Sequence, residues 1–181
     1  DEKLPVDGVL RKECGELQLA FSDQEAKRID KLMTLAWPPH VLRQVDAAEA
    51  SALAGIELSH GGLWFPASGW LAPPQLCAAL LNSSAITPHT GHAVKSLIPI
   101  NNGWHVQTVD QRKQTRTFEA EIVVVCTGYQ VKSLPPLASL PLTPVRGQLT
   151  LIPATTASKH LRTIVCGSGY LAPAIAGRHV V

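Results

Sequence analysis

The sequence has no GxGxxG pattern anywhere in its 181 residues. That pattern cradles the pyrophosphate of a dinucleotide in a complete Rossmann fold, so the chain does not encode a complete fold of that kind. One GSG, at Gly167 to Gly169, follows an apolar run, but the residues after it do not have the character of a helix. We therefore do not interpret it as a phosphate loop.

Signatures of metal sites and of nucleophilic hydrolases are also missing. The four cysteines are widely separated: Cys14, Cys77, Cys126 and Cys166. There is no CxxC pair, His89 and His92 have no evident third ligand, and no serine has the GxSxG context. Cys77 and Cys126 stand in apolar runs, which predicts that they are small core residues. This cysteine usage favours a reducing, cytoplasmic compartment.

Charge and long apolar runs are in short supply. Sixteen Lys and Arg against fourteen Asp and Glu give a net charge of +2, which leaves no strong overall footprint for nucleic acid or membrane. A local RNA contact is compatible with this value because net charge averages over all faces. No apolar run approaches the ~20 residues of a membrane-spanning helix, and no signal peptide is visible. The chain starts at Asp1 and ends in a strand-like GRHVV, so we expect an excised part of a longer protein.

The most distinctive stretch present is HGGLWFPASGWLAPPQL, residues 60–76. It predicts a strand, a tight turn, an extended segment and the first turn of a helix, because Pro73 and Pro74 are tolerated at a helix start. Trp64, Phe65 and Trp70 supply large apolar surfaces. Either they form an aromatic corner of the core, or part of this loop is a wall of a ligand pocket.

Local signals predict the remaining elements. Ser22 with Glu25 forms a capping box for a helix to about residue 36, and Asp46 caps a second helix that Gly55 closes. A third helix, residues 74–81, is apolar on most faces and is expected to be buried. Asn101-Asn102-Gly103 predicts a hairpin between two strands. Further strands are expected near residues 6–12, 16–20, 41–45, 145–153 and 162–166.

The clearest buried strand is expected at residues 121–128, EIVVVCTG, because its centre is continuously apolar. It ends at Thr127-Gly128, where the small side chains let a ligand or another backbone approach closely. An ordinary strand-to-loop turn explains the same residues equally well. With many strands, hairpins and about three helices, the chain predicts a mixed α+β fold with a largely antiparallel sheet and helices on one side.

Four segments in a fixed order carry a family resemblance: GGLWFPASGWLAPPQL, EIVVVCTGYQ, LPLTPVRGQLTLIP and IVCGSGYLAP. Together they resemble the D-amino-acid-oxidase-like family of FAD-dependent amine oxidoreductases. Within it they are most similar to the oxidoreductases that mature the wobble uridine of certain bacterial tRNAs. Ser68 departs from the usual glycine before Gly69-Trp70-Leu71, and Cys126-Thr127 replaces the usual Ala-Asn. The family's GxGxxG unit and the C-terminal part of its FAD site are absent from this chain.

The resemblance implies that residues 1–85 and 129–181 belong mainly to the substrate lobe and residues 86–128 to the FAD lobe. It implies that Val94, Thr127 and Gly128 contact FAD, and that Trp70 and Tyr170 line the substrate cavity. No residue is expected to be catalytic in the strict sense, since flavin carries the hard chemistry.

The implied reaction of the parent protein is oxidation of an amine C–N bond, which in the tRNA enzymes removes the carboxymethyl group of 5-carboxymethylaminomethyl-(2-thio)uridine. A glycine, sarcosine or D-amino-acid oxidase of the same family is the alternative substrate class. A non-catalytic module that docks a protein through the aromatic loop is an alternative of another class. The fragment alone is expected to be inactive, and open strand edges predict a tendency to dimerise.

Overall fold

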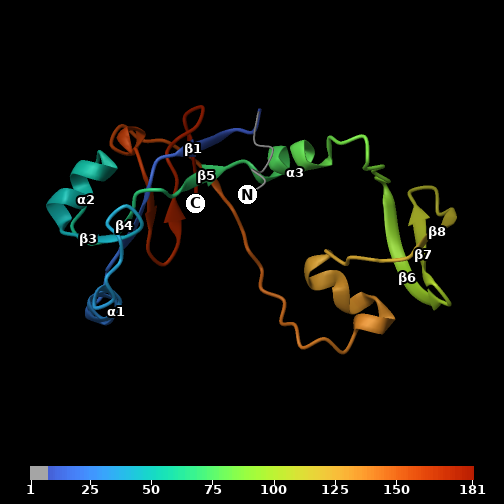
Figure 1. The fold of residues 1–181 in the computed structure, drawn as a ribbon. Helices are drawn as coiled ribbons and strands as arrows, with labels where there is room; N and C mark the ends of the chain where they lie inside the picture. The colour runs from blue at the N-terminus through green and yellow to red at the C-terminus, as the bar shows by residue number, and fades with distance from the viewer. Residues whose placement is uncertain (1–7) are drawn as a thin grey trace. The chain divides into compact units, whose positions relative to one another are not determined.

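The computed structural model describes residues 8–181, which fall into two units. Unit 1 is formed by residues 1–83 together with 148–181, and unit 2 by residues 84–147 (Figure 1). The strand expected at residues 6–12 lies partly outside the described residues. The predicted boundaries between substrate and FAD lobes, at residues 85/86 and 128/129, are not tested by this division, and the assignment of the lobes stays a prediction.

The centre of unit 1 is a five-stranded sheet with the order β11-β10-β2-β4-β3. Its strands are β2 (Glu16–Leu19), β3 (Arg43–Val45), β4 (Gly62–Phe65), β10 (Ile164–Cys166) and β11 (Tyr170–Leu171). Every neighbouring pair is antiparallel except β10 with β2. The glycine at position 62 is needed because a side chain there would overlap the carbonyl of Gln18 on the adjacent strand.

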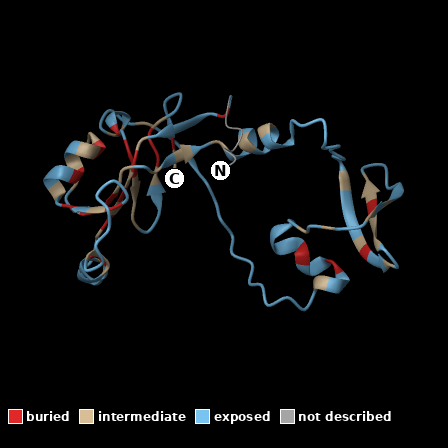
Figure 2. Cartoon of the chain, viewed as in Figure 1, coloured by how far each residue is buried: buried red, intermediate tan, exposed pale blue. Residues whose placement is uncertain are grey.

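Two helices cover opposite faces of this sheet. Trp64 points to the face where α2 (Ala47–Ala54) packs, and Leu63, the residue before it, points to the face where α1 (Asp23–Met33) packs. Figure 2 shows the buried residues gathered along these strands. The mixed α+β class is confirmed, but the expectation of helices on one side was wrong. Neighbouring strand residues point to opposite faces, so the consecutive apolar residues of β4 need cover on both.

The helix ends follow the predicted capping signals. The Ser22 hydroxyl accepts the Glu25 N–H at 3.2 Å, and the Glu25 carboxylate accepts the Phe21 N–H at 2.9 Å. Asp46 accepts the Glu49 N–H at 2.8 Å, and Gly55 closes α2 in the left-handed conformation. Because each cap satisfies N–H groups that have no partner inside the helix, short-range sequence determines where these helices begin.

The aromatic stretch folds in the predicted order. β4 is followed by a turn, by β5 (Gly69–Leu71) and by α3 (Pro73–Leu81), and β5 pairs with β1 (Arg11–Glu13). The expected burial of α3 was wrong, since none of its residues is buried. Apolar composition predicts burial only where another element covers the helix, and no helix or strand among the described residues packs extensively on α3.

A small two-stranded sheet completes unit 1. It pairs β9 (Leu151–Pro153) with β12 (Arg178–Val180), and the short 3₁₀ helix η3 (Ser158–His160) lies between them in sequence. The strand expected at residues 145–153 is therefore much shorter, because only its last three residues have a partner strand among the described residues.

Unit 2 is built on an antiparallel meander of β6 (His92–Ile100), β7 (Gly103–Asp110) and β8 (Thr115–Ala120). The Asn101-Asn102-Gly103 hairpin is confirmed, and β8 is a third strand that the sequence analysis did not predict. Two 3₁₀ helices, η1 (Gly128–Ser133) and η2 (Pro135–Leu137), follow, and η2 contacts β6. Val131 and Leu134 of this segment are buried.

The predicted buried strand at residues 121–128 was wrong. The segment is extended up to η1 but pairs with no strand in the part of the chain that the structure describes. Ile122 and Val124 are 80% and 79% exposed. A continuous apolar run favours a central strand only where neighbouring strands supply hydrogen-bond partners and cover, and none does so here.

The prediction that two of the cysteines are core residues was also wrong. Cys77 and Cys126 are exposed rather than core residues, because α3 and the 121–128 segment that carry them are uncovered. None of the helices within residues 8–181 combines the length and apolarity needed to cross a membrane.

Candidate functional site

Trp70 lies on the ribbon of β1 and β5, opposite Lys12. Its neighbour Gly69 must be glycine, because a Cβ there would overlap the carbonyl of Lys12. The ribbon borders a depression of about 190 Å³ that Trp70 helps to line. Among residues 8–181, the indole Nε1 of Trp70 is the single buried side-chain nitrogen or oxygen atom without a hydrogen-bond partner.

An orphaned buried donor is uncommon, since leaving it unpaired costs about 1–3 kcal/mol. Tryptophan Nε1 only donates, so the missing partner must be an acceptor. A carbonyl, carboxylate or phosphate oxygen would fit. Trp70 helps to line the depression, and its role as a pocket wall stays a prediction. Trp64 is a core residue and Phe65 packs against the α1 face.

Tyr170 begins β11, where it pairs with Cys166 across a tight turn. The turn is closed by the Gly167 N–H donating to the Gly169 carbonyl at 2.8 Å. Tyr170 is 41% exposed, and its side chain makes no hydrogen bond in the described structure. Trp70 and Tyr170 both belong to unit 1, but no hydrogen bond or ring contact joins them.

The three expected FAD contacts all lie in unit 2. Val94 is on β6 opposite Thr108, next to an irregularity in the pairing at Lys95, and it is exposed. Thr127 directly precedes η1, and Gly128 opens it with φ of +56°. A Cβ on Gly128 would meet nothing within 4 Å, so its backbone stands open to a ligand. These features fit a cofactor contact at the backbone of Thr127 and Gly128.

Two histidines that the sequence offered as a weak metal pair instead form an aromatic cluster. The His89 ring lies 4.6 Å from the Phe118 ring, and the His92 ring lies 6.0 Å from it in an edge-on arrangement. The Nδ1 of His92 is 3.3 Å from the Thr108 hydroxyl. Within the described residues, no group of three or more His, Cys, Asp or Glu is placed to hold a metal ion.

His179 is a polar core residue that the sequence did not single out. It is 1% exposed, with Nδ1 2.7 Å from the Ala172 carbonyl and Nε2 2.9 Å from the Ser158 hydroxyl. The carbonyl can only accept, so Nδ1 carries the proton and Nε2 accepts from Ser158. This network ties β12 to η3 and to the chain after β11. Its sequence signal is no more than a single histidine between Arg178 and Val180.

Cys166 has a perturbed thiol. Burial, together with the charge and hydrogen bonding of Glu16, raises the pKa of Cys166 to about 11. The pKa of Cys14 is also raised, by burial above all. Both thiols are therefore protonated near neutral pH and are poor nucleophiles.

The described residues contain no evident set of acid, base and nucleophile. What they offer is an indole donor without a partner, an exposed tyrosine and an open backbone at the start of η1. Trp70 and Tyr170 belong to unit 1 and η1 to unit 2, and each of these features by itself is of a kind that binds and orients a ligand.

Comparisons with known proteins identify relatives of this chain. Residues 2–181 match the family model described as FAD dependent oxidoreductase. The chain is 77% identical over all 181 residues to the tRNA 5-methylaminomethyl-2-thiouridine biosynthesis bifunctional protein MnmC of Nitrosospira multiformis. It is 39% identical over 168 residues, 93% of the chain, to the protein of the same name from Pseudomonas paraeruginosa. The chain spans 29% and 25% of the lengths of these two relatives.

The fold has a counterpart among solved structures. Glycine oxidase from Bacillus cereus superposes with a TM-score of 0.72 at 18% identity, over 95% of this chain and 49% of the oxidase. At that identity the likeness speaks for the fold alone. The family match over nearly the whole chain and the high identity to full-length relatives establish its membership: the chain belongs to the FAD dependent oxidoreductase family.

Proposed function

We propose that the protein containing this chain is an FAD-dependent oxidoreductase that removes the carboxymethyl group from 5-carboxymethylaminomethyl-(2-thio)uridine at the wobble position of tRNA. The observation that supports this proposal is the 77% identity, over all 181 residues of the chain, to a protein named for tRNA 5-methylaminomethyl-2-thiouridine biosynthesis. This protein acts in the cytoplasm, where bacterial tRNA is modified.

In this proposal, the residues of the chain hold and orient the cofactor and the substrate. Gly128, beside Thr127, offers open backbone to the cofactor, and Val94 offers an exposed apolar side chain to its adenine end. FAD, when bound, supplies the two-electron oxidation of the amine. Trp70 and Tyr170 line the substrate cavity, and the unpaired indole N–H of Trp70 donates to an oxygen of the bound ligand.

We assign residues 1–85 and 129–181 mainly to the substrate lobe and residues 86–128 to the FAD lobe. The proposed substrate contacts, Trp70 and Tyr170, fall in unit 1 and the proposed cofactor contacts, Val94, Thr127 and Gly128, in unit 2, although unit 2 extends to Gly147, beyond the assigned FAD lobe. The 181-residue chain alone, which has no GxGxxG, is expected to bind FAD weakly and to be inactive.

Flavin reduction tests the proposal on the full-length protein. The FAD-loaded protein, mixed anaerobically with tRNA that carries the carboxymethylaminomethyl group, should lose its flavin absorbance, while tRNA without the group should leave it unchanged. Reduction by glycine, sarcosine or a D-amino acid instead would establish the alternative oxidase. A full-length protein that binds no flavin would favour a non-catalytic interaction module.

A homodimer through unpaired strand edges is also proposed. Residues 122–126 present exposed apolar side chains and backbone without a partner strand among the described residues, which invites pairing with a second copy. Light scattering coupled to size-exclusion chromatography should give about twice the monomer mass for the 181-residue chain. A monomer at all concentrations would contradict it.

A further inference from the structure

The charges of the chain are divided unequally between its units. Residues 84–147 contain six Lys and Arg but three Asp and Glu, a formal net charge of +3, whereas the remaining residues contain ten and eleven. The modest net charge of +2 for the whole chain therefore conceals a basic unit 2.

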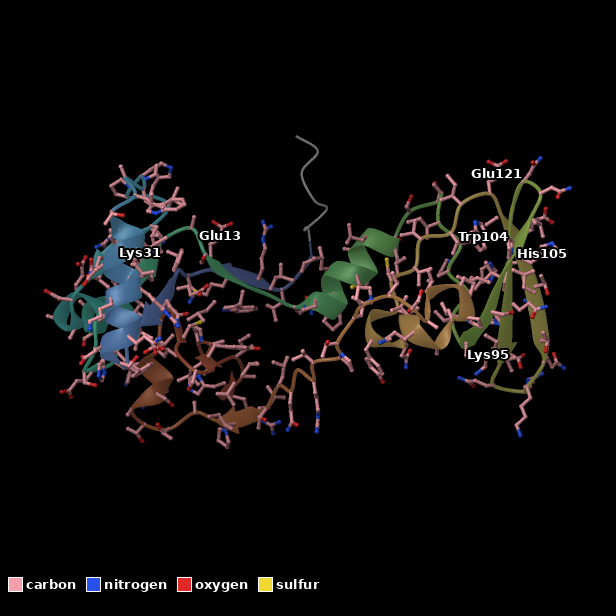
Figure 3. The ribbon with its side chains drawn as sticks, turned by 90° about the horizontal axis from the view of Figure 1, so that it is seen from below. Glu13, Lys31, Lys95, Trp104, His105 and Glu121 are labelled. Carbon is pink, nitrogen blue, oxygen red and sulfur yellow. The ribbon has the colours of Figure 1, made fainter. Side chains whose placement is uncertain are left out.

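Within unit 2 the cations gather at one end of the β6–β7–β8 sheet. Arg112 and Lys113 lie in the turn between β7 and β8, and Arg116 on β8 is paired with Thr108. Thr108 also pairs with Val94, directly before Lys95. Figure 3 shows Lys95 at one end of this sheet, with Trp104, His105 and Glu121 towards the other. We call Lys95, Arg112, Lys113 and Arg116 the basic end.

The turn that presents these cations is held in one shape. The Asp110 carboxylate accepts the N–H groups of Arg112 and Gln114, each at 2.8 Å, and Lys113 adopts a left-handed φ of 63°. These hydrogen bonds do not remove the charge of the Asp110 carboxylate, but the four cations of the basic end outnumber it. None of the four cations of the basic end, all exposed, makes an ion pair within residues 8–181.

Aromatic rings lie at the same end. Phe118 is two residues after Arg116, so both side chains project from the same face of β8. The exposed His89 ring lies 4.6 Å from Phe118, and His92, opposite Asp110 at the end of the ladder, completes the cluster. Unpaired cations around aromatic rings are the pattern by which proteins bind RNA, because phosphates pair with the cations while unstacked bases stack on the rings.

We propose that the basic end, with the His89–His92–Phe118 cluster, is a tRNA-binding surface that contacts backbone phosphates and an unstacked base. The inference rests on the tRNA substrate proposed above and assigns the contact to residues other than those of the substrate cavity. Acidic protein segments would pair with the cations but would gain little from the rings, so RNA is the partner that uses both features.

The test measures the affinity of the full-length protein for tRNA by fluorescence anisotropy at several KCl concentrations between roughly 50 and 200 mM. This range resolves the slope of log K against log salt. Arg112→Gln with Lys113→Gln should weaken binding about tenfold and make the slope of log K against log salt shallower by about 1.4, for two lost phosphate contacts. His89→Ala should weaken binding about fivefold or more and leave the slope unchanged, because stacking releases no counterions. The matched control is Lys27→Gln with Lys31→Gln on α1 in unit 1, which should behave as wild type.

The outcomes separate the two proposals. Wild-type protein that does not bind tRNA overturns the proposed function and this surface together. If wild type binds tRNA but the Arg112/Lys113 variant matches the α1 control in affinity and slope, the surface alone is overturned. Flavin absorbance per protein is measured in every variant: if it falls with tRNA binding, the basic end belongs to the cofactor site and the inference is again overturned.

Discussion

The indole of Trp64 occupies the space into which a side chain on Gly15 would project. Gly15 has a φ of +71°, and a Cβ there would overlap the Cη2 atom of Trp64. This contact lies where the β1–β5 ribbon continues into the β2–β4 pair, with the Gly15 N–H donating to the Ser68 carbonyl at 2.8 Å. Gly15 thereby joins the core tryptophan to the turn that presents Trp70.

Gly15→Ala should therefore destabilise the protein by about 3 kcal/mol, from backbone strain together with overpacking against Trp64. Equilibrium unfolding in urea measures this. Gly169→Ala is the matched control in the same unit, because its Cβ would meet nothing within 4 Å and its φ is not in the left-handed range. Equal midpoints for the two variants would show that Trp64 moves aside without cost.

The α1 cap predicts a smaller effect. Ser22→Ala removes the acceptor of the Glu25 N–H and should lower the free energy of unfolding by about 1 kcal/mol. Ser22→Asp, which keeps an acceptor and adds a favourable charge at the helix start, should unfold close to wild type. If alanine and aspartate gave the same urea midpoint, the cap would not contribute.

The buried histidine network predicts coupling. His179→Leu leaves the Ala172 carbonyl and the Ser158 hydroxyl without their partner and should cost about 2–3 kcal/mol, while Ser158→Ala should cost about 1 kcal/mol. In the double variant the penalties should not add, because the Ser158–His179 bond is already lost in each single variant. Additive unfolding free energies would mean that the two side chains do not interact.

Thiol chemistry tests the environment of Cys166. Its pKa of about 11 means that alkylation at pH 8 should modify the exposed Cys77 and Cys126 long before Cys166, as mass spectrometry of digested protein would show. Glu16→Gln removes a cause of the raised pKa and should speed the modification of Cys166. Unchanged Cys166 kinetics in this variant would leave burial as the sole cause.

The raised pKa of Cys166 also makes the stability of the fold depend on pH. The folded pKa of Cys166 lies above its ordinary value of 9.0, so the fold favours the neutral thiol. This contribution is fully present below pH 9 and is lost as the pH rises towards about 11. Cys166→Ser should flatten this part of the profile of unfolding free energy against pH.

Short-range signals predicted much of the fold. The Ser22–Glu25 cap and the Asn101-Asn102-Gly103 hairpin depend on residues a few positions apart, and both are present in the structure. The consecutive apolar residues of β4 also indicated that both faces of the sheet are covered, although the prediction placed the helices on one side. The apolar run at Ile122 could not be predicted correctly, because its outcome depends on whether distant strands are there to pair with it.

The site was less accessible to sequence reasoning. Trp70 could be selected from its motif, but its unpaired Nε1 is a property of the folded ribbon. His179 forms a hydrogen bond with Ser158, 21 residues away in the sequence, and no local sequence pattern predicts such a pair. The basic end was hidden because a net charge of +2 averages over two units of different charge.

The candidate pocket can be tested at Trp70 itself. Trp70→Phe keeps the ring surface but removes the N–H donor, so the full-length protein should retain its flavin and its fold while KM for the tRNA substrate rises several-fold. Trp37→Phe, an exposed tryptophan of unit 1, is the control. Wild-type kinetics in Trp70→Phe would remove the indole N–H from substrate binding.

The central claim is decided by the nucleoside product. FAD-loaded full-length protein is incubated with tRNA that carries 5-carboxymethylaminomethyl-2-thiouridine, and the digested tRNA is analysed by liquid chromatography and mass spectrometry. This nucleoside should disappear as 5-aminomethyl-2-thiouridine accumulates in equal amount. An unchanged carboxymethylaminomethyl nucleoside, with the flavin bound and the tRNA intact, would contradict it.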